Sequence, residues 1–109
     1  MRGLIYNVTY KVELAIADEF FKWMAEEHVI NVLKTGMFDS VSLTRVRLDD
    51  KDGETFAYQY KTPSEQYLHK FTTELAPDLD AAIHKRFPNK FVYFSSILEV
   101  VDEYNVKFT

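Results

Sequence analysis

Apolar and polar residues alternate along four stretches of the chain, which predicts four β-strands. The first stretch, LIYNVTYKVE, interleaves β-branched and aromatic residues with polar ones, as a half-buried strand requires. Asp49–Gly53 separates the second and third stretches, and its Asp-Gly pair favours the positive φ of a tight hairpin, so these two strands should be antiparallel neighbours. The predicted strands cover residues 4–13, 38–49, 54–61 and 90 to about 102.

Helical spacing of apolar residues predicts two helices between these strands. The first covers residues 17–35, and Gly36 follows it where a left-handed C-terminal cap is favoured. The second begins at Thr62-Pro63-Ser64-Glu65, which matches a capping box with proline at the first helical position. We expect Pro77 to kink or interrupt this helix, which then resumes from residue 78 to about residue 86.

The resulting order, βαββαβ, is the ferredoxin-like pattern of an α+β fold. Right-handed crossovers place both helices on one face of a four-stranded antiparallel sheet. No linker, repeat or low-complexity segment divides the sequence, so residues 1–109 should form a single domain.

The last predicted strand indicates what covers the second face of the sheet. Its two alternating sets of side chains are both mainly apolar, so neither side should be solvated. We therefore expect a homodimer in which two sheets pack face to face into an α/β barrel. The alternative is a wet face with scattered exposed aromatic residues. The two sets are Phe91, Tyr93, Ser95, Ile97, Val101 and Val92, Phe94, Ser96, Leu98, Val100.

Composition excludes several classes of function. A net charge of −4 disfavours general binding to nucleic acid, and the absence of cysteine removes thiolate chemistry. Three glycines without a phosphate-binding motif argue against nucleotide-dependent chemistry and leave no cofactor expected. No apolar run is long enough to span a membrane, and the N-terminal run breaks at Asn7, so we expect a cytoplasmic protein.

His28 is the first candidate site residue. It lies within the stripe formed by Phe20, Phe21, Met24 and Val32 on the first helix, so it should face the sheet. It is then either a core residue or the polar end of a pocket, where it could transfer a proton or hold an anion.

Arg45 is a second candidate, because it shares a strand face with Val41 and Leu43 and could hold a carboxylate if it is not simply a solvated edge charge. Phe56, Tyr58 and Tyr60 also share a face, which partly resembles the base-stacking strand of RNA-recognition domains. The acidic net charge and the absence of that motif's basic residue and glycine argue against RNA binding.

The remaining histidines predict no metal site. Glu65 with His69, and Asp80 with His84, have i, i+4 spacing, but each pair supplies only two ligands on a helix face that should be solvated. Trp23 is either a packing residue or part of a subunit contact.

Six short segments, spread over nearly the whole chain, form a recognisable pattern. They are Ile5-Tyr6-Asn7-Val8-Thr9, Trp23-Met24 with Glu27-His28, Val32-Leu33-x-Thr35-Gly36-x-Phe38, Tyr58-Gln59-Tyr60, Lys90-Phe91-Val92-x-Phe94 and Leu98-Glu99-Val100. This pattern resembles an uncharacterised bacterial family, the domain of unknown function DUF4286, grouped with the dimeric α/β-barrel proteins.

The resemblance implies a homodimer and a pocket between the sheet and the helices of one subunit, with His28, Tyr6 and Tyr58 as lining. The wider superfamily contains cofactor-free monooxygenases, haem-degrading enzymes, isomerases and non-enzymatic stress proteins, so the resemblance supplies no activity. Two hypotheses follow. The first is a non-enzymatic or ligand-binding dimer, in which His28 and the nearby tyrosines are either structural or contact a small organic ligand. The alternative is a cofactor-free monooxygenase or isomerase in which His28 is the general base and Tyr58 or Arg45 stabilises an enolate.

Overall fold

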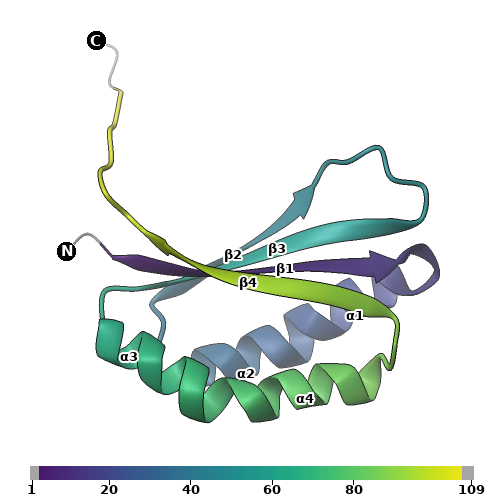
Figure 1. The fold of residues 1–109 in the computed structure, drawn as a ribbon, viewed down its shortest axis with the longest axis horizontal. Coiled ribbons are helices and arrows are strands. Elements are labelled where there is room, and N and C mark those ends of the chain that lie inside the picture. Colours follow the sequence, from purple (N-terminus) through teal and green to yellow (C-terminus); the bar gives the residue numbers. More distant parts are fainter. Residues whose placement is uncertain (1–2, 107–109) are drawn as a thin grey trace.

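Two long helices pack against one face of a four-stranded antiparallel sheet (Figure 1). The computed structural model describes residues 3–106. The strands follow the order β2-β3-β1-β4 across the sheet, and the ferredoxin-like α+β fold is confirmed. Their bounds are β1 Leu4–Glu13, β2 Ser40–Val46, β3 Gly53–Thr62 and β4 Phe91–Glu99.

The first helix begins with a 3-10 turn and contains one π turn. It is built from η1 (Leu14–Ile16), α1 (Ala17–Trp23), the π turn η2 (Met24–His28) and α2 (Val29–Lys34). In a regular α-helix, residues spaced by four drift around the axis by roughly 40° per step. A π turn holds more residues and offsets this drift. The consequence is a straight buried line of side chains at Phe20, Met24, His28 and Val32.

The second helix has the same construction, with α3 (Glu65–Lys70), the π turn η3 (Phe71–Leu75) and α4 (Ala76–Arg86). Pro77 does not interrupt it, contrary to our expectation. The wider η3 turn directly before the proline accommodates the missing amide donor and the ring. The expected cap is also displaced, because the Ser64 hydroxyl accepts the Tyr67 amide at 3.1 Å and the helix begins at Glu65.

Glycine serves two different purposes in the loops. Gly36 has the predicted left-handed conformation, with a φ of 76°. Gly53 does not need a positive φ. A Cβ there would lie 2.4 Å from the Val12 carbonyl oxygen, so the residue is required by the close approach of β3 to β1.

The face of the sheet beneath the helices is aromatic. Tyr10 lies at its centre, with ring centroids 5.4 Å from Tyr58 and 5.5 Å from Phe20. Phe56, Tyr58 and Tyr60 are at most 2% exposed, so they cannot stack on bases, and the RNA-binding hypothesis has no support from this strand. Trp23 packs edge-on against Phe87 at 5.7 Å, which favours its packing interpretation.

Beneath this core, the opposite face of the sheet is less apolar than the sequence led us to expect. Over β1, β2 and β3 it carries mostly serine, threonine, asparagine and glutamine side chains. Large exposed apolar side chains on this face follow β4, where Val92 is 68%, Phe94 63% and Leu98 41% exposed. We call these three residues the β4 strip. The polar residues of the face include Asn7, Thr9, Ser42, Thr44 and Gln59.

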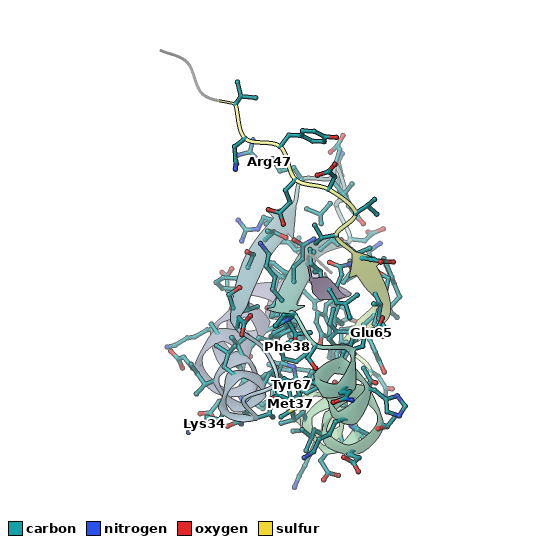
Figure 2. The ribbon with its side chains drawn as sticks, turned by 90° about the vertical axis from the view of Figure 1, so that its left-hand side faces the viewer. Lys34, Met37, Phe38, Arg47, Glu65 and Tyr67 are labelled. Carbon is teal, nitrogen blue, oxygen red and sulfur yellow. The ribbon has the colours of Figure 1, made fainter. Side chains whose placement is uncertain are left out.

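Strand β4 ends three residues earlier than predicted, and the chain then leaves the sheet. Residues 100–106 form an extended arm that points away from the domain (Figure 1). Val101, Tyr104 and Val106 on this arm are each at least 75% exposed. Figure 2 shows the arm on the side of the sheet opposite the helices, with Met37 and Phe38 at the helix layer and Arg47 far from both.

Candidate functional site

His28 faces the sheet as predicted, but it belongs to the closed core. It is the last residue of η2 and only 5% exposed. Burial lowers the pKa of its imidazole to about 4, so the ring is neutral near pH 7. No hydrogen bond joins the ring to another residue within the described range 3–106. His28 is therefore a buried neutral side chain rather than a group in contact with solvent.

Tyr58 lies in the same core. Its side chain is fully buried, and its hydroxyl has no hydrogen-bond partner among the described residues. Burial raises the pKa of this phenol well above its usual value, so it stays protonated. Tyr58 and His28 both lack the access to solvent that a binding residue on a preformed pocket would have.

Arg45 lies on the edge strand β2, with its side chain 59% exposed. Its guanidinium pairs with the Glu54 carboxylate at 3.4 Å and covers the Phe56 ring at 5.5 Å. Arg45 on β2 pairs with Phe56 on β3, whereas Tyr6 on β1 pairs with Tyr60 on β3. Arg45 and Tyr6 thus lie on opposite sides of β3, at positions four residues apart along that strand. The structure thus does not bring the four predicted site residues together.

Arg45 lines an open hollow of about 270 Å³ together with Asp50 and Glu54. Tyr6 lines a separate cavity between a helix and the sheet, which also has several polar groups. This cavity has a volume of about 410 Å³ and lies between the second helix and the sheet, at the edge formed by β4. We call it the Asp80 cavity. Its polar lining consists of Tyr6, Thr72, Asp80, Ser95 and Ser96, and its apolar lining of Ala76, Pro77 and Ile97.

Asp80 is the charged residue of this lining. Burial raises the pKa of its carboxyl group, and the neighbouring His84 partly offsets this shift. No ion pair or hydrogen bond to Asp80 occurs among residues 3–106. A half-buried carboxylate without a partner is costly, and it is therefore a ready acceptor for a ligand.

Several phenols lie within the field of Asp80. Burial raises the pKa of Tyr6, and Asp80 raises it further, while the Ser95 hydroxyl opposes both effects. The pKa values of Tyr10 and Tyr60 are also raised, chiefly by burial and with a contribution from Asp80. The charge of Asp80 therefore adds to the effect of burial in keeping these phenols protonated.

His84 is exposed, as predicted, but its ring is not free of contacts. It stacks on Phe91 with centroids 4.9 Å apart and approaches Tyr93 at 5.7 Å. The sequence showed Asp80 and His84 only as two residues with metal-ligand spacing. The cavity forms because β4 places Ser95 and Ile97 beside Asp80. These segments are far apart in the sequence, so no local pattern predicts the cavity.

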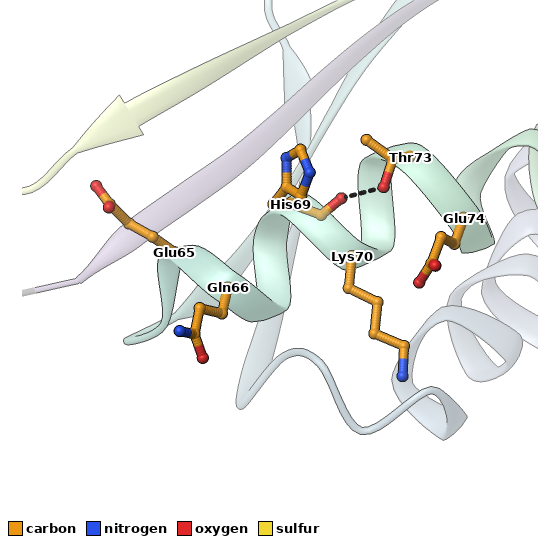
Figure 3. Close-up of a pocket in the computed structure, with 6 residues that line it drawn as sticks. All are labelled: Glu65, Gln66, His69, Lys70, Thr73 and Glu74. Atoms are coloured by element: carbon orange, nitrogen blue, oxygen red, sulfur yellow. Dashed lines mark hydrogen bonds between the residues drawn. The ribbon is translucent and has the colours of Figure 1, made fainter.

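The other histidine, His69, lies with Glu65 on the outer surface of the second helix (Figure 3). Gln66, Lys70, Thr73 and Glu74 share a shallow hollow with them, and the Thr73 hydroxyl donates to the His69 carbonyl oxygen at 2.7 Å. Nowhere in residues 3–106 do three potential metal ligands of the His, Cys, Asp or Glu type come together. Among the same residues, no helix is both long and apolar enough to cross a bilayer.

Comparison with known families gives a match over almost the whole length. A family described as a domain of unknown function (DUF4286) matches residues 3–101. The chain belongs to this family. No curated protein matches it.

Several solved structures share the backbone fold of this DUF4286 protein but little of its sequence. A dimeric ferredoxin-like protein from an uncultured marine organism is 11% identical, with a TM-score of 0.74 over 95% of this chain and 100% of that one. A putative antibiotic biosynthesis monooxygenase from Bacillus cereus is 14% identical, with a TM-score of 0.68 over 97% and 100%. SnoaB, a cofactor-independent oxygenase from Streptomyces nogalater, is 9% identical, with a TM-score of 0.63 over 94% and 97%. At such identities the likeness establishes the fold alone.

Proposed function

We propose that this DUF4286 protein is a homodimer that binds a small organic ligand in the Asp80 cavity. The observation that carries the binding proposal is an unpaired, half-buried carboxylate facing a 410 Å³ space together with Tyr6 and Ser95. Pockets for small molecules combine an apolar wall with a few convergent polar groups in this size range. Ile97 and Pro77 supply such a wall.

A ligand of the native state should raise the melting temperature by mass action. In a thermal-shift screen against a metabolite panel, we expect at least one compound to stabilise the native protein but not Ser95→Trp, whose indole fills the cavity. Gln66→Trp places the same side chain on the exposed surface of α3 and should respond like the native protein. A panel without any stabilising compound, or equal shifts in Ser95→Trp, would count against this site.

The dimer proposal rests on the exposure of β4 on both faces. The β4 strip is exposed on the face away from the helices, and on the helix side Tyr93 is 44% and Ile97 56% exposed. Exposed apolar side chains on both faces of one edge strand favour an interaction site there. The exposed arm lies at the end of the same strand, so it can reach across a second copy. The dimeric state stated for the marine ferredoxin-like protein is in keeping with this arrangement.

Sedimentation of the native protein at micromolar concentration should give about twice the 12.8 kDa chain mass. Phe94→Asp should shift the protein to monomer, because it places a charge in the centre of the β4 strip. Leu48→Asp is the matched control, since Leu48 is also exposed, at 61%, but lies outside β4. A native monomer, or equal dissociation in both variants, would disprove the proposed interface.

The alternative hypothesis, a cofactor-free monooxygenase or isomerase, required His28 to act as the general base. A base must come within hydrogen-bonding distance of the proton that it removes. His28 is 5% exposed and is not among the residues that line the Asp80 cavity. Its burial favours the structural role, so we assign the ligand site to the Asp80 cavity rather than to His28.

A further inference from the structure

The described lining of the Asp80 cavity carries charge of one sign. Asp80 supplies a carboxylate, and among residues 3–106 no lysine or arginine lines the cavity. The other polar side chains of the described lining are hydroxyls, from Tyr6, Thr72, Ser95 and Ser96. His84, one helical turn further along, is an exposed imidazole stacked on Phe91. The described lining thus has an anionic centre, and the basic group that acts on it, the His84 imidazole, lies outside the lining.

This arrangement discriminates among ligands by charge. A carboxylate or phosphate would be repelled by Asp80 and would find no basic side chain to offset the repulsion. A neutral alcohol could donate one hydrogen bond to the carboxylate. A cation could form a charge-assisted hydrogen bond, which is roughly twice as strong as a neutral one, and would neutralise a charge that burial makes unfavourable.

The shape of the lining adds a second requirement. Ala76, Pro77 and Ile97 form an apolar wall beside the polar groups, and Ile97 is 56% exposed. An ammonium ion or metal ion alone would leave this wall in water. A molecule with a cationic head and an apolar body would cover it and would pair with the carboxylate at the same time.

We propose that the ligand of the Asp80 cavity is a small organic amine with an apolar body, held by an ion pair to Asp80 and by hydrogen bonds to the hydroxyls of Tyr6 and Ser95. The proposal rests on the proposed function of this cavity as a ligand site. Tyr6 can accept a hydrogen bond from an ammonium group with its phenol oxygen, and Ser95 can do the same from the neighbouring strand β4 on the same face of the sheet. Asp80 then acts as the residue that determines specificity.

Three probes of similar shape but different charge test two questions separately. They show whether the cavity binds a ligand, and whether it prefers an amine. We would titrate the full-length protein, labelled with ¹⁵N, with 2-phenylethylamine, 2-phenylethanol and phenylacetate, and follow amide resonances. The amine should bind most tightly and should shift the resonances of Ser95, Ser96 and Ile97. Asp80→Asn should weaken amine binding at least tenfold and leave alcohol binding within a factor of about two.

Asp78→Asn is the matched control, because it removes the same charge from an exposed position two residues away on α4 and should change amine binding less than twofold. Asp80→Ser repeats the test if the asparagine variant folds poorly. Binding of the alcohol or phenylacetate at the cavity as tightly as the amine, or an unchanged amine affinity in Asp80→Asn, would overturn the proposed ligand class and leave the site intact. Shifts at none of these three residues with any probe would overturn the site itself.

Discussion

Replacing Phe20 by alanine should lower the free energy of unfolding by about 3–5 kcal/mol, because the substitution opens a cavity that the surrounding core cannot close. Phe20 is fully buried, and its ring centroid lies 5.2 Å from that of Phe87 and 5.6 Å from that of Phe91. It therefore connects the first helix both to the end of the second and to the edge strand β4. Urea unfolding followed by circular dichroism measures the change.

Phe21→Ala is the control for this prediction. The Phe21→Ala substitution removes the same atoms at the adjacent position, but Phe21 is 39% exposed. Among residues 3–106, its ring contacts one other ring, that of Phe56. We expect a clearly smaller loss of stability in this variant. Similar losses at both positions would mean that the first helix does not pack on the sheet as described.

Acidification below neutral pH should destabilise the protein through His28. The folded-state pKa of His28 is about 4, compared with 6.5 when the residue is unfolded and solvated. The unfolded chain therefore binds the proton more readily. Stability from neutral His28 is fully present above about pH 6.5 and is lost as the pH falls towards 4. The loss at pH 5 should be about 2 kcal/mol.

Urea unfolding at intervals between pH 7 and pH 5 tests this prediction. His28→Leu should flatten the pH dependence, since leucine cannot take up a proton. His69→Leu removes an exposed histidine and should retain the native profile. If the native and His28→Leu profiles were parallel, another group would have to be responsible for the acid sensitivity.

Much of the fold could be predicted from the sequence. Where one face of a helix or strand is exposed to solvent, the spacing of apolar residues indicates which face is buried. The alternation in residues 4–13 gave β1 its bounds without error. At β2 the same signal continued past the strand, since the apolar Phe38 is buried before the strand begins and Leu48 is exposed after it ends. Alternation alone does not distinguish a paired residue from its neighbour in a loop.

The faces of the sheet were harder to assign. Both alternating sets of β4 are apolar, which indicated burial on both sides, yet in the single chain both sides are largely exposed. The polar character of the opposite face over β2 and β3 also followed only from the register. Which set lies beneath the helices depends on how strands pair, and pairing is determined by residues far apart in the chain.

Most of the candidate site was missed for a related reason. Residue type and helical spacing favoured His28, which lies buried in the core, whereas Tyr6 is the predicted residue that lines the Asp80 cavity. The helical spacing of Asp80 predicts a solvated charge. Asp80 is half-buried because Tyr6 on β1 and Ser95 on β4 line the same cavity. Chemistry that arises where distant segments meet has no signature within either segment.

The two π turns have a consequence for how this family can change its length. Removing a single residue from η2 would convert it into an ordinary α-helical turn and leave the segments on either side in nearly the same phase, so Val32 would still face the sheet. Removing a residue from α1 or α2 would instead rotate everything that follows by about 100°. Insertions and deletions in either helix should therefore be tolerated only when they preserve the phase of the four-residue repeat, while the loops beyond each helix remain free to vary.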